Sequence, residues 1–341
     1  MIAPAQRIRV KFLGTYNPHA WIRQFPDNIP VWGNCEFALG PEATDYDWLV
    51  VYNDLPSKSP EQVLPCPQQQ TILVTTEPSS IKSYGSAFTA QFGYVLTSQE
   101  PWALPHPQRI YSQPALQWYY GLGQTRLRSY RQMADTPPLH KSRLLSTVCS
   151  TKQQRHTLHQ KRYRFTQALK ERIPWLDIYG HGVQEIDDKA ESLDAYRYQL
   201  AIENHISLHH WTEKLSDVFL GAALPFYCGC PNAADYFPPE SFIPLDINDV
   251  EGSCNIILQA IEEQQYERRL NAILEARRRV LEDYNIFSVL TRIINEHHPA
   301  SQSPTAGGVV LSRRLLRKRR PLVALQSVYE KARVRALNAW R

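Results

Sequence analysis

A helix start rich in ionisable groups follows a polar loop in the second half of this 341-residue chain. Thr212 is a good N-cap residue, and Glu213 and Lys214 fall in the first turn behind it. The backbone N–H groups and the dipole of a helix start favour an anion, and Lys214 adds a full positive charge. We therefore expect a phosphate group to bind here.

The elements that position this helix have the pattern of an α/β sheet. Residues 199–202 form a short apolar strand, and the polar residues Glu203 and Asn204 follow it. Gly221 ends the helix, and residues 224–228 predict the next strand. The polar loop and the helix start thus lie at a strand end, where ligands bind in such sheets.

The stretch 196–245 resembles the signature of the family 10 glycosyltransferases, the α-1,3/4-fucosyltransferases. Several of the family's motifs occur here in the family's order and at matching spacing, which is more specific than any single motif. They are Tyr196-Arg197-Tyr198, Glu203-Asn204, Trp211-Thr212-Glu213-Lys214-Leu215, Pro225, Gly229, Pro231-Asn232 and Pro239-Glu240-Ser241-Phe242-Ile243.

This resemblance implies roles for particular residues. Asn204 and Glu213 would contact the nucleotide sugar, while Gly229 and Asn232 would have secondary or structural roles. Glu203 would be either a second polar contact or a buried, hydrogen-bonded structural carboxylate. The chain departs from the family at His210, where many members carry tyrosine. His210 is therefore a candidate donor contact, and a GDP-sugar other than GDP-fucose stays an alternative donor.

An arginine in the preceding helix is a second candidate phosphate ligand. Residues 158–173 predict a basic amphipathic helix, and Arg162, Phe165, Ala168 and Leu169 match the family's R-x-x-F-x-x-A-L motif. By the resemblance, Arg162 contacts the diphosphate, a task that suits the planar and permanently charged guanidinium. The alternative is a solvated helix face, since several neighbouring residues are also basic.

The candidate catalytic base is in the first half of the chain. Glu77 directly follows the predicted strand 71–76, and catalytic groups gather at the carboxyl ends of strands in open α/β sheets. In the resembled family, a glutamate after a strand of this domain is the proposed general base. The alternative is an exposed loop carboxylate.

Three other patterns predict structure instead of chemistry. Asp45-Tyr46-Asp47 resembles a metal-binding D-x-D motif, but it precedes a strand and so lies at the wrong end of the sheet. Gly180 and Gly182 predict a tight turn after a strand. The histidines and cysteines of residues 205–230 have no common zinc-site spacing, so we expect no metal, and the six cysteines are expected to be buried or loop thiols.

The order of elements predicts two Rossmann-like domains. Strands are expected at residues 7–12, 47–52, 71–76 and 94–97, and the pattern restarts with strands at 143–149 and 176–179. Helices are expected at residues 253–263, 266–284 and 286–296, with Arg277, Arg278 and Arg279 on a solvated face. The resemblance implies a GT-B-like α/β fold with domains 1–138 and 139–298 facing a central cleft, the first for the acceptor and the second for the nucleotide sugar.

Positive charge is concentrated in the last forty residues, which we expect to form a linker and a basic tail (299–341). Residues 312–341 contain ten Lys or Arg and one Glu, a net charge of +9, whereas the rest of the chain carries −4. Within 313–341, one helical face is apolar, although Val334 breaks the pattern; its members are Leu322, Leu325, Tyr329, Ala332, Ala336 and Trp340. A basic amphipathic helix of this kind is typical of binding to an anionic membrane surface.

The resemblance implies an inverting transfer of L-fucose from GDP-fucose to a hydroxyl of an oligosaccharide or glycolipid, such as lipopolysaccharide or another surface glycan. We expect no tightly bound cofactor, no required metal and no nucleic-acid partner. No apolar run approaches the ~20 residues of a membrane span and no signal-peptide core is evident. We expect a cytoplasmic protein on the inner face of the membrane. The distant alternative is a non-catalytic, basic-tailed nucleic-acid-binding protein.

Overall fold

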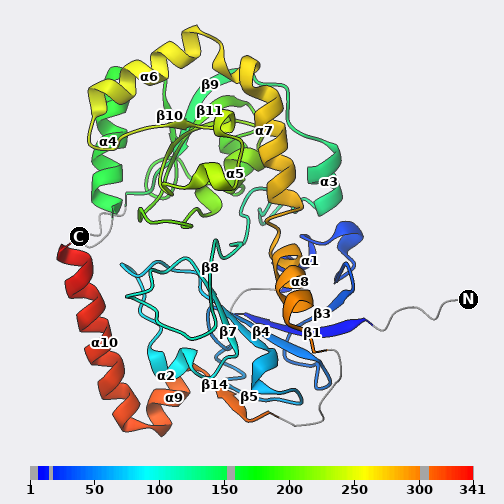
Figure 1. The fold of residues 1–341 in the computed structure, drawn as a ribbon. Coiled ribbons are helices and arrows are strands. Elements are labelled where there is room, and N and C mark those ends of the chain that lie inside the picture. Colours follow the sequence, from blue (N-terminus) through cyan, green and yellow to red (C-terminus); the bar gives the residue numbers. More distant parts are fainter. Residues whose placement is uncertain (1–6, 15–17, 152–157, 300–306, 341) are drawn as a thin grey trace, which may run out of the picture. The chain divides into compact units, whose positions relative to one another are not determined.

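The computed structural model describes residues 7–14, 18–151, 158–299 and 307–340 of the chain. The chain divides into two compact units, and each is described by itself. Unit 1 comprises residues 1–114 and 286–341, and unit 2 comprises residues 115–285. Each unit has its own sheet, drawn with its helices in Figure 1.

Unit 1 contains a seven-stranded sheet in the order β2-β3-β1-β4-β6-β7-β8. All neighbours are parallel except β2 and β3. The central strand β4 is buried along its whole length, as its uninterrupted apolar sequence WLVVY predicts. The strands are β1 (Ile8–Gly14), β2 (Val31–Trp32), β3 (Cys35–Leu39), β4 (Trp48–Tyr52), β6 (Thr71–Val74), β7 (Tyr94–Thr97) and β8 (Arg109–Tyr111).

Unit 2 contains a parallel five-stranded sheet in the order β10-β9-β11-β12-β13. The strands are β9 (Arg143–Val148), β10 (Asp177–Tyr179), β11 (Tyr196–Ile202), β12 (Leu224–Cys228) and β13 (Ile243–Pro244). The helices are α3 (Tyr130–Asp135), α4 (His159–Arg172), α5 (Glu213–Leu220), α6 (Val250–Glu262) and α7 (Gln265–Leu281). Both units therefore have the parallel α/β architecture that the sequence predicts.

The unit boundaries differ from the predicted ones. Residues 115–138 were assigned to the first domain, but they pack in unit 2 because buried carboxylates hold them there. Asp217 accepts hydrogen bonds from the backbone N–H groups of Tyr119 and Tyr120 at 3.0 and 3.1 Å. The Tyr120 hydroxyl in turn donates to Asp194 at 2.7 Å.

Helix α8 (Ile286–His297), assigned to the second domain by sequence, belongs to unit 1. Its Phe287 ring stacks on Phe25 with centroids 3.8 Å apart. His297 and His298, which precede the predicted linker, are anchored by aromatic residues. His297 stacks on Tyr94, and the His298 Nδ1 accepts a hydrogen bond from the Trp48 indole at 3.0 Å. The predicted linker residues 300–306 lie outside the described residues.

The basic tail is folded onto unit 1. Strand β14 (Val309–Leu311) pairs antiparallel with β5 (Glu61–Val63), and two helices, α9 (Arg313–Arg319) and α10 (Pro321–Trp340), follow. In Figure 1, α10 is the long red helix beside α2 (Ser86–Thr89). The Glu330 carboxylate accepts a hydrogen bond from the backbone N–H of Ser86 at 3.0 Å. The remaining short helix of unit 1 is α1 (Pro18–Ile22).

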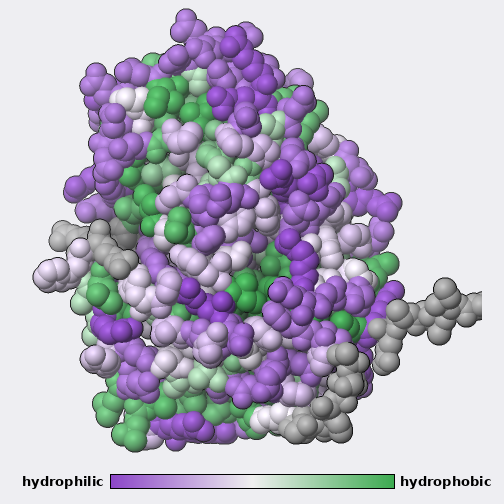
Figure 2. All heavy atoms as spheres, viewed as in Figure 1, coloured by the Kyte–Doolittle hydropathy of each residue, from purple (hydrophilic) through white to green (hydrophobic). Residues whose placement is uncertain are grey.

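The tail presents its apolar stripe to solvent and packs by its opposite side. Leu322 is 80% exposed and Trp340 is 90% exposed, and Leu325 and Tyr329 are also exposed. Val334, which breaks the predicted apolar face, is instead buried against unit 1. Figure 2 shows hydrophobic side chains, in green, at the surface where α10 begins. The packing of Val334 thus leaves the predicted apolar face free.

Arginine 277 is another difference from the sequence analysis. It was placed on a solvated face, but its side chain is buried and Nε donates to the carbonyl oxygen of Leu220 at 3.1 Å. Burial lowers the pKa of Arg277. The neighbouring Arg278 instead lies at the surface and pairs with Glu275 and Glu282 at 2.9 and 2.7 Å. One turn of α7 thus carries both a structural and a surface arginine.

Candidate functional site

The candidate donor site of unit 2 begins at the carboxyl end of β11. Glu203 follows the last residue of this strand and is completely buried. One carboxylate oxygen accepts a hydrogen bond from the Thr212 backbone N–H at 2.8 Å, and the other accepts one from the Thr212 hydroxyl at 2.7 Å. Glu203 therefore fixes the start of α5. This arrangement favours the predicted role of a buried structural carboxylate over that of a second polar contact to the nucleotide sugar.

Thr212 is the N-cap of α5, as predicted. Its hydroxyl accepts a hydrogen bond from the Lys214 backbone N–H at 3.3 Å. Because Thr212 has β-region backbone angles and both of its polar groups are held by Glu203, the direction in which the helix begins is fixed. The sequence pattern that predicted this cap is local. The structure adds the Glu203 carboxylate at the end of β11, which holds Thr212 in place.

Lys214 lies between two carboxylates. Its Nζ is 2.9 Å from Glu213 and 3.7 Å from Glu203. Burial alone would lower the pKa of Lys214, but the charges of Glu213 and Glu203 raise it. Burial by itself would also raise the pKa of Glu213, yet Lys214 and Lys189 hold it well below its ordinary value. The electrostatic effect of this pairing favours the charged form of both side chains, and Lys214 belongs to a cluster of charges instead of being an isolated cation.

Sequence reasoning missed Lys189, the other cation of this cluster. Its Nζ is 2.8 Å from Asp217 and 3.9 Å from Glu213. Lys189 is more than twenty residues away in sequence and in a short 3-10 turn, Lys189–Ser192, so no local motif indicates it. Only the packing of that turn against α5 brings it to the site.

Arg162 extends from α4 to the same strand end. Its Nη1 donates to the carbonyl oxygen of Ile202, the last residue of β11, at 3.3 Å. The side chain is buried, and its Nε has no hydrogen-bond partner among the residues that the structure describes. A buried guanidinium N–H without an acceptor is rare because it loses its hydration without compensation. Arg162 is therefore not on a solvated helix face, and its buried N–H is available to bind an anion.

Asn204 contributes a second buried polar atom without a hydrogen-bond partner among the described residues. Its side-chain Oδ1 is buried and has no partner within the described part of the chain. Its backbone carbonyl accepts from the Leu158 N–H at 3.2 Å, one turn before Arg162 in the chain. Arg162 also acts electrostatically on Lys214. The structure thus brings Arg162, Asn204 and the start of α5 together at one end of the sheet.

His210 and Asn232 complete the loops around this strand end. The His210 side chain is buried, with its ring 5.6 Å from that of His205. Asn232 ties two loops together, because its Oδ1 accepts from the His209 backbone N–H at 2.8 Å while its Nδ2 donates to Asp235 at 2.9 Å. Asn232 therefore has the structural role that was predicted for it.

Position 229 requires glycine because neighbouring side chains approach its backbone closely. A Cβ at this position would lie 2.4 Å from Glu203 Cγ and 2.4 Å from the Tyr227 hydroxyl. Both neighbours are buried, so neither side chain has room to move. Gly229 therefore allows the loop after β12 to pass directly over the buried carboxylate.

We expect Gly229→Ala to lower the free energy of unfolding by about 1–3 kcal/mol, the usual cost of overpacking a filled interior. Urea unfolding measures this change. Gly308→Ala is the matched control, because a Cβ there would meet no atom within 4 Å. Equal stability of the two variants would contradict the close approach.

Glu77 lies in unit 1, after β6, at the carboxyl edge that the sequence predicted. The half-buried residue lines a cavity of about 380 Å³ together with Lys82, Tyr84, Arg313 and Lys331. The Tyr84 hydroxyl donates to Asn53 at 3.0 Å and accepts from the Thr76 backbone N–H at 2.8 Å. This network fixes the loop that carries Glu77.

The surroundings of Glu77 are cationic. Burial, together with the charge of Arg313, lowers the pKa of Lys82 to about 8. Lys82 also interacts electrostatically with Glu77 and donates to the Asn53 side chain. No motif indicated Lys82 or Arg313, because one is in a loop and the other in the tail. Both residues line the same cavity as the candidate base, Glu77.

The other patterns noted in the sequence lie at the following places in the structure. Asp45 and Asp47 both pair with Arg9 before β4 begins, so they are not at a ligand-binding edge. Gly180 and Gly182 have φ values of +129° and +80° in the turn after β10. All six cysteines are buried free thiols. Among the described residues, no group of three or more His, Cys, Asp or Glu side chains is arranged to hold a metal ion.

Part of the chain is similar in sequence to known proteins. Residues 138–268 match the model of glycosyltransferase family 10 (fucosyltransferase), C-terminal part. Over 91 residues the chain is 36% identical to a 4-galactosyl-N-acetylglucosaminide 3-alpha-L-fucosyltransferase of Gorilla gorilla gorilla, covering 25% of this chain and 24% of that protein. It is 34% identical over 58 residues to an alpha-(1,3)-fucosyltransferase of Helicobacter pylori, covering 17% and 12%.

A solved structure extends the likeness to the fold. The crystal structure of an alpha1,3-fucosyltransferase aligns with a TM-score of 0.50 and 16% identity, covering 80% of this chain and 82% of that chain. The sequence matches, by contrast, span about a quarter or less of the length of the curated relatives. The GT-B-like class of two Rossmann-like units is thereby confirmed.

Proposed function

Because the chain belongs to glycosyltransferase family 10, the fucosyltransferases, through residues 138–268, we propose that it transfers L-fucose from GDP-fucose to a hydroxyl group of an oligosaccharide. The observation that carries this proposal is a pair of buried groups, on Arg162 and Asn204 at the carboxyl end of β11, that have no hydrogen-bond partner among the described residues. They lie beside the N-terminus of α5, where an anion is favoured. A nucleoside diphosphate would satisfy all three, because its phosphate oxygens accept from Arg162 and the helix start while a hydroxyl or N–H of the nucleoside donates to the Asn204 Oδ1.

The proposed reaction inverts the anomeric carbon. Glu77 takes the proton of the acceptor hydroxyl while the acceptor oxygen forms a bond to C1 of fucose. The bond between C1 and the diphosphate oxygen breaks, and its electron pair leaves with GDP. Arg162, Lys214 and the backbone N–H groups at the start of α5 stabilise the negative charge that develops on the diphosphate. The proposed step requires no bound metal.

The experiment that tests this function is a GDP-release assay with a panel of GDP-sugars. Galactose- and N-acetylglucosamine-containing oligosaccharides serve as acceptors. We expect turnover with GDP-fucose; turnover with another GDP-sugar alone would favour the alternative donor that His210 keeps open. No turnover with any donor, accompanied by salt-sensitive binding to nucleic acid, would favour the non-catalytic alternative.

We further propose that the protein works on the inner face of a membrane and that the acceptor is a lipopolysaccharide or another surface glycan. The support is the exposed apolar stripe of α10, flanked by Arg and Lys side chains. Such a helix inserts its apolar side chains into the interface while its cations meet anionic headgroups. Within the described residues, no helix combines the length and apolarity needed to cross a bilayer.

Leu325→Glu is expected to weaken binding to vesicles that contain anionic lipid by roughly tenfold or more, since it places a charge in the inserted face. Co-sedimentation at low and high salt measures the binding. Leu258→Glu on α6 is the matched control, because Leu258 is also an exposed helical leucine but is not in the tail. If both variants bind like the unchanged protein, the stripe is not the membrane contact.

A further inference from the structure

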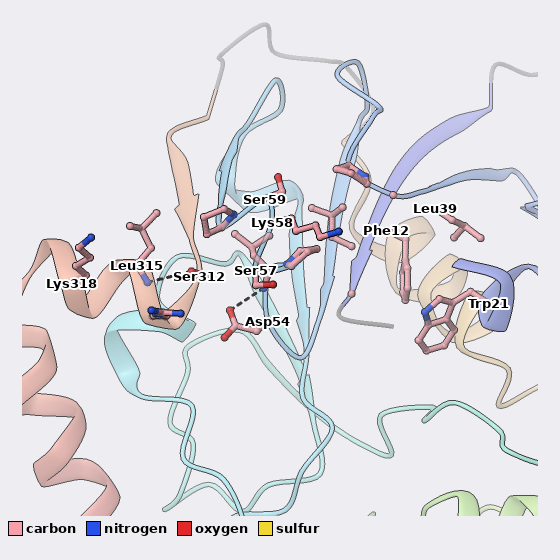
Figure 3. A pocket seen from close by; sticks show the side chains of 18 residues that line it. Phe12, Trp21, Leu39, Asp54, Ser57, Lys58, Ser59, Ser312, Leu315 and Lys318 are labelled. Carbon is pink, nitrogen blue, oxygen red and sulfur yellow. Dashed lines mark hydrogen bonds between the residues drawn. The ribbon is translucent and has the colours of Figure 1, made fainter. Parts of the chain in front are cut away.

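Unit 1 contains an elongated apolar cavity that the proposed transfer does not use. Its volume is about 830 Å³, within the range of roughly 300–1,000 Å³ that is common for small-molecule sites. Figure 3 shows side chains that line it from α9, with Leu315 and Lys318, to β1, β3 and α1, with Phe12, Leu39 and Trp21. The cavity adjoins the carboxyl ends of β1, β3 and β4.

Two of the polar residues that line the cavity, Asp54 and Ser312, are already engaged. Both carboxylate oxygens of Asp54 are used: one accepts from the Leu55 backbone N–H at 2.9 Å, and the other pairs with Arg313 at 3.2 Å. The Ser312 hydroxyl accepts from the Leu315 N–H at 3.2 Å as the N-cap of α9. The rest of the lining is mainly apolar, with Phe12, Trp21 and Leu39 among its residues, so it suits a hydrocarbon chain better than a sugar.

The rim of the cavity is cationic. Arg314 and Lys318 are one turn apart on α9, and Lys58 belongs to the loop after β4. All three are exposed, and none forms an ion pair with any residue that the structure describes. Because the single carboxylate in the lining, Asp54, is neutralised by Arg313, this rim favours a negatively charged group.

The cavity is built by contacts that hold its walls in place. The buried Lys11 Nζ donates to the carbonyl oxygens of Pro41 and Ala43 at 2.8 and 2.7 Å, which fixes the loop on one side. On the other side, the Ser312 N–H donates to the carbonyl oxygen of Pro60 at 2.7 Å and positions α9. The folded tail thus completes the site.

We propose that this cavity binds the hydrocarbon chain of an anionic amphiphile, with a phosphate-type headgroup at Lys58, Arg314 and Lys318. Two sources have this chemistry: a lipid of the membrane surface, or a lipid attached to the acceptor itself. The second source rests on the proposed glycosyl transfer, whereas the binding itself does not.

Binding is tested with decyl phosphate below its micellar concentration, by titration calorimetry on the full chain. We expect saturable binding at one site, and at least tenfold weaker binding by the variant Arg314→Glu/Lys318→Glu. Leu39→Trp, which fills the apolar end, is expected to have a similar effect. Arg320→Glu is the matched control, because it removes a cation from the end of the same helix but does not line the cavity.

The proposal is overturned if the unchanged protein does not bind decyl phosphate, or if both the rim and the filling variants bind it as the unchanged protein does. It is also overturned if decyl maltoside, with its neutral headgroup, binds equally well. Thermal unfolding shows whether each variant is folded. Because the rim and filling variants alter different walls, the loss of one to misfolding leaves the other as a test.

A kinetic measurement distinguishes a lipid of the membrane surface from a lipid attached to the acceptor. One oligosaccharide acceptor is compared with and without a decyl phosphate aglycone. A lower KM for the lipid-bearing acceptor that is lost in Leu39→Trp assigns the chain to the acceptor. An unchanged KM, with weaker binding of Leu39→Trp to anionic vesicles, assigns it to a membrane lipid. If no fucose is transferred at all, the proposed function is wrong. The calorimetric titration still shows whether the cavity binds decyl phosphate.

Discussion

Glu77→Ala is expected to lower kcat by roughly 10²–10⁴-fold, the usual contribution of a general base, while the Kd for GDP stays unchanged. The reason is that Glu77 lines a cavity of unit 1, whereas the candidate GDP ligands belong to unit 2. Initial-rate measurements of GDP release, together with calorimetric titration of GDP, measure the two quantities separately.

The isosteric change Glu77→Gln sharpens this test, because the amide retains the shape of the carboxylate but does not accept the proton. It is expected to be as slow as alanine. Glu36→Gln, an exposed carboxylate on β3, is the matched control and should keep full activity. A Glu77→Gln variant with full activity would rule out Glu77 as the base.

Arg162→Ala is expected to raise the Kd for GDP by roughly 10–100-fold, because a hydrogen bond to a charged partner contributes about 1.5–3 kcal/mol. The buried Nε of Arg162, which has no partner in the described part of the chain, is the group that would meet the diphosphate. We also expect kcat to fall, since this cation would stabilise the leaving group. Calorimetric titration of GDP and initial rates are the measurements.

Arg164→Ala provides the control on the same helix, because Arg164 is exposed and two residues from Arg162. It should bind GDP as the unchanged protein does. If the two variants bound GDP equally well, the basic character of α4 and not one particular guanidinium would be responsible, and the assigned role of Arg162 would be wrong.

The difference between Arg162 and Arg277 illustrates what sequence patterns leave open. Both are arginines on basic helical segments, and charge alone does not separate them. Arg162 is matched by motif spacing, and its position at the end of β11 agrees with that match. Arg277 was expected in solvent, but it is buried because α3 and the end of α5 supply carbonyl oxygens that accept its N–H groups. Those acceptors are far away in sequence.

Several strands of the two sheets could be predicted because buried parallel strands are short apolar runs, and β4, β7 and β12 were found in this way. Strand β3 was among those missed, since the charged residue Glu36 interrupts its sequence CEFAL. Its pairing with β1 depends on tertiary contacts and not on a local pattern. The unit boundary at residue 115 was missed for the same reason, because carboxylates from distant segments hold residues 119–121.

The sequence by itself determined the cap at Thr212, the strand end at Glu203 and Asn204, and the spacing of Arg162, because these signals are local and lie within single elements. Tertiary structure alone decided which charges are neutralised and which are not. It placed Lys214 between two carboxylates and folded the tail against the loop after β4. It also left the Arg162 Nε without a partner among the residues that the structure describes. The physical reason is that desolvation and pairing of a charge depend on groups brought together from distant parts of the chain.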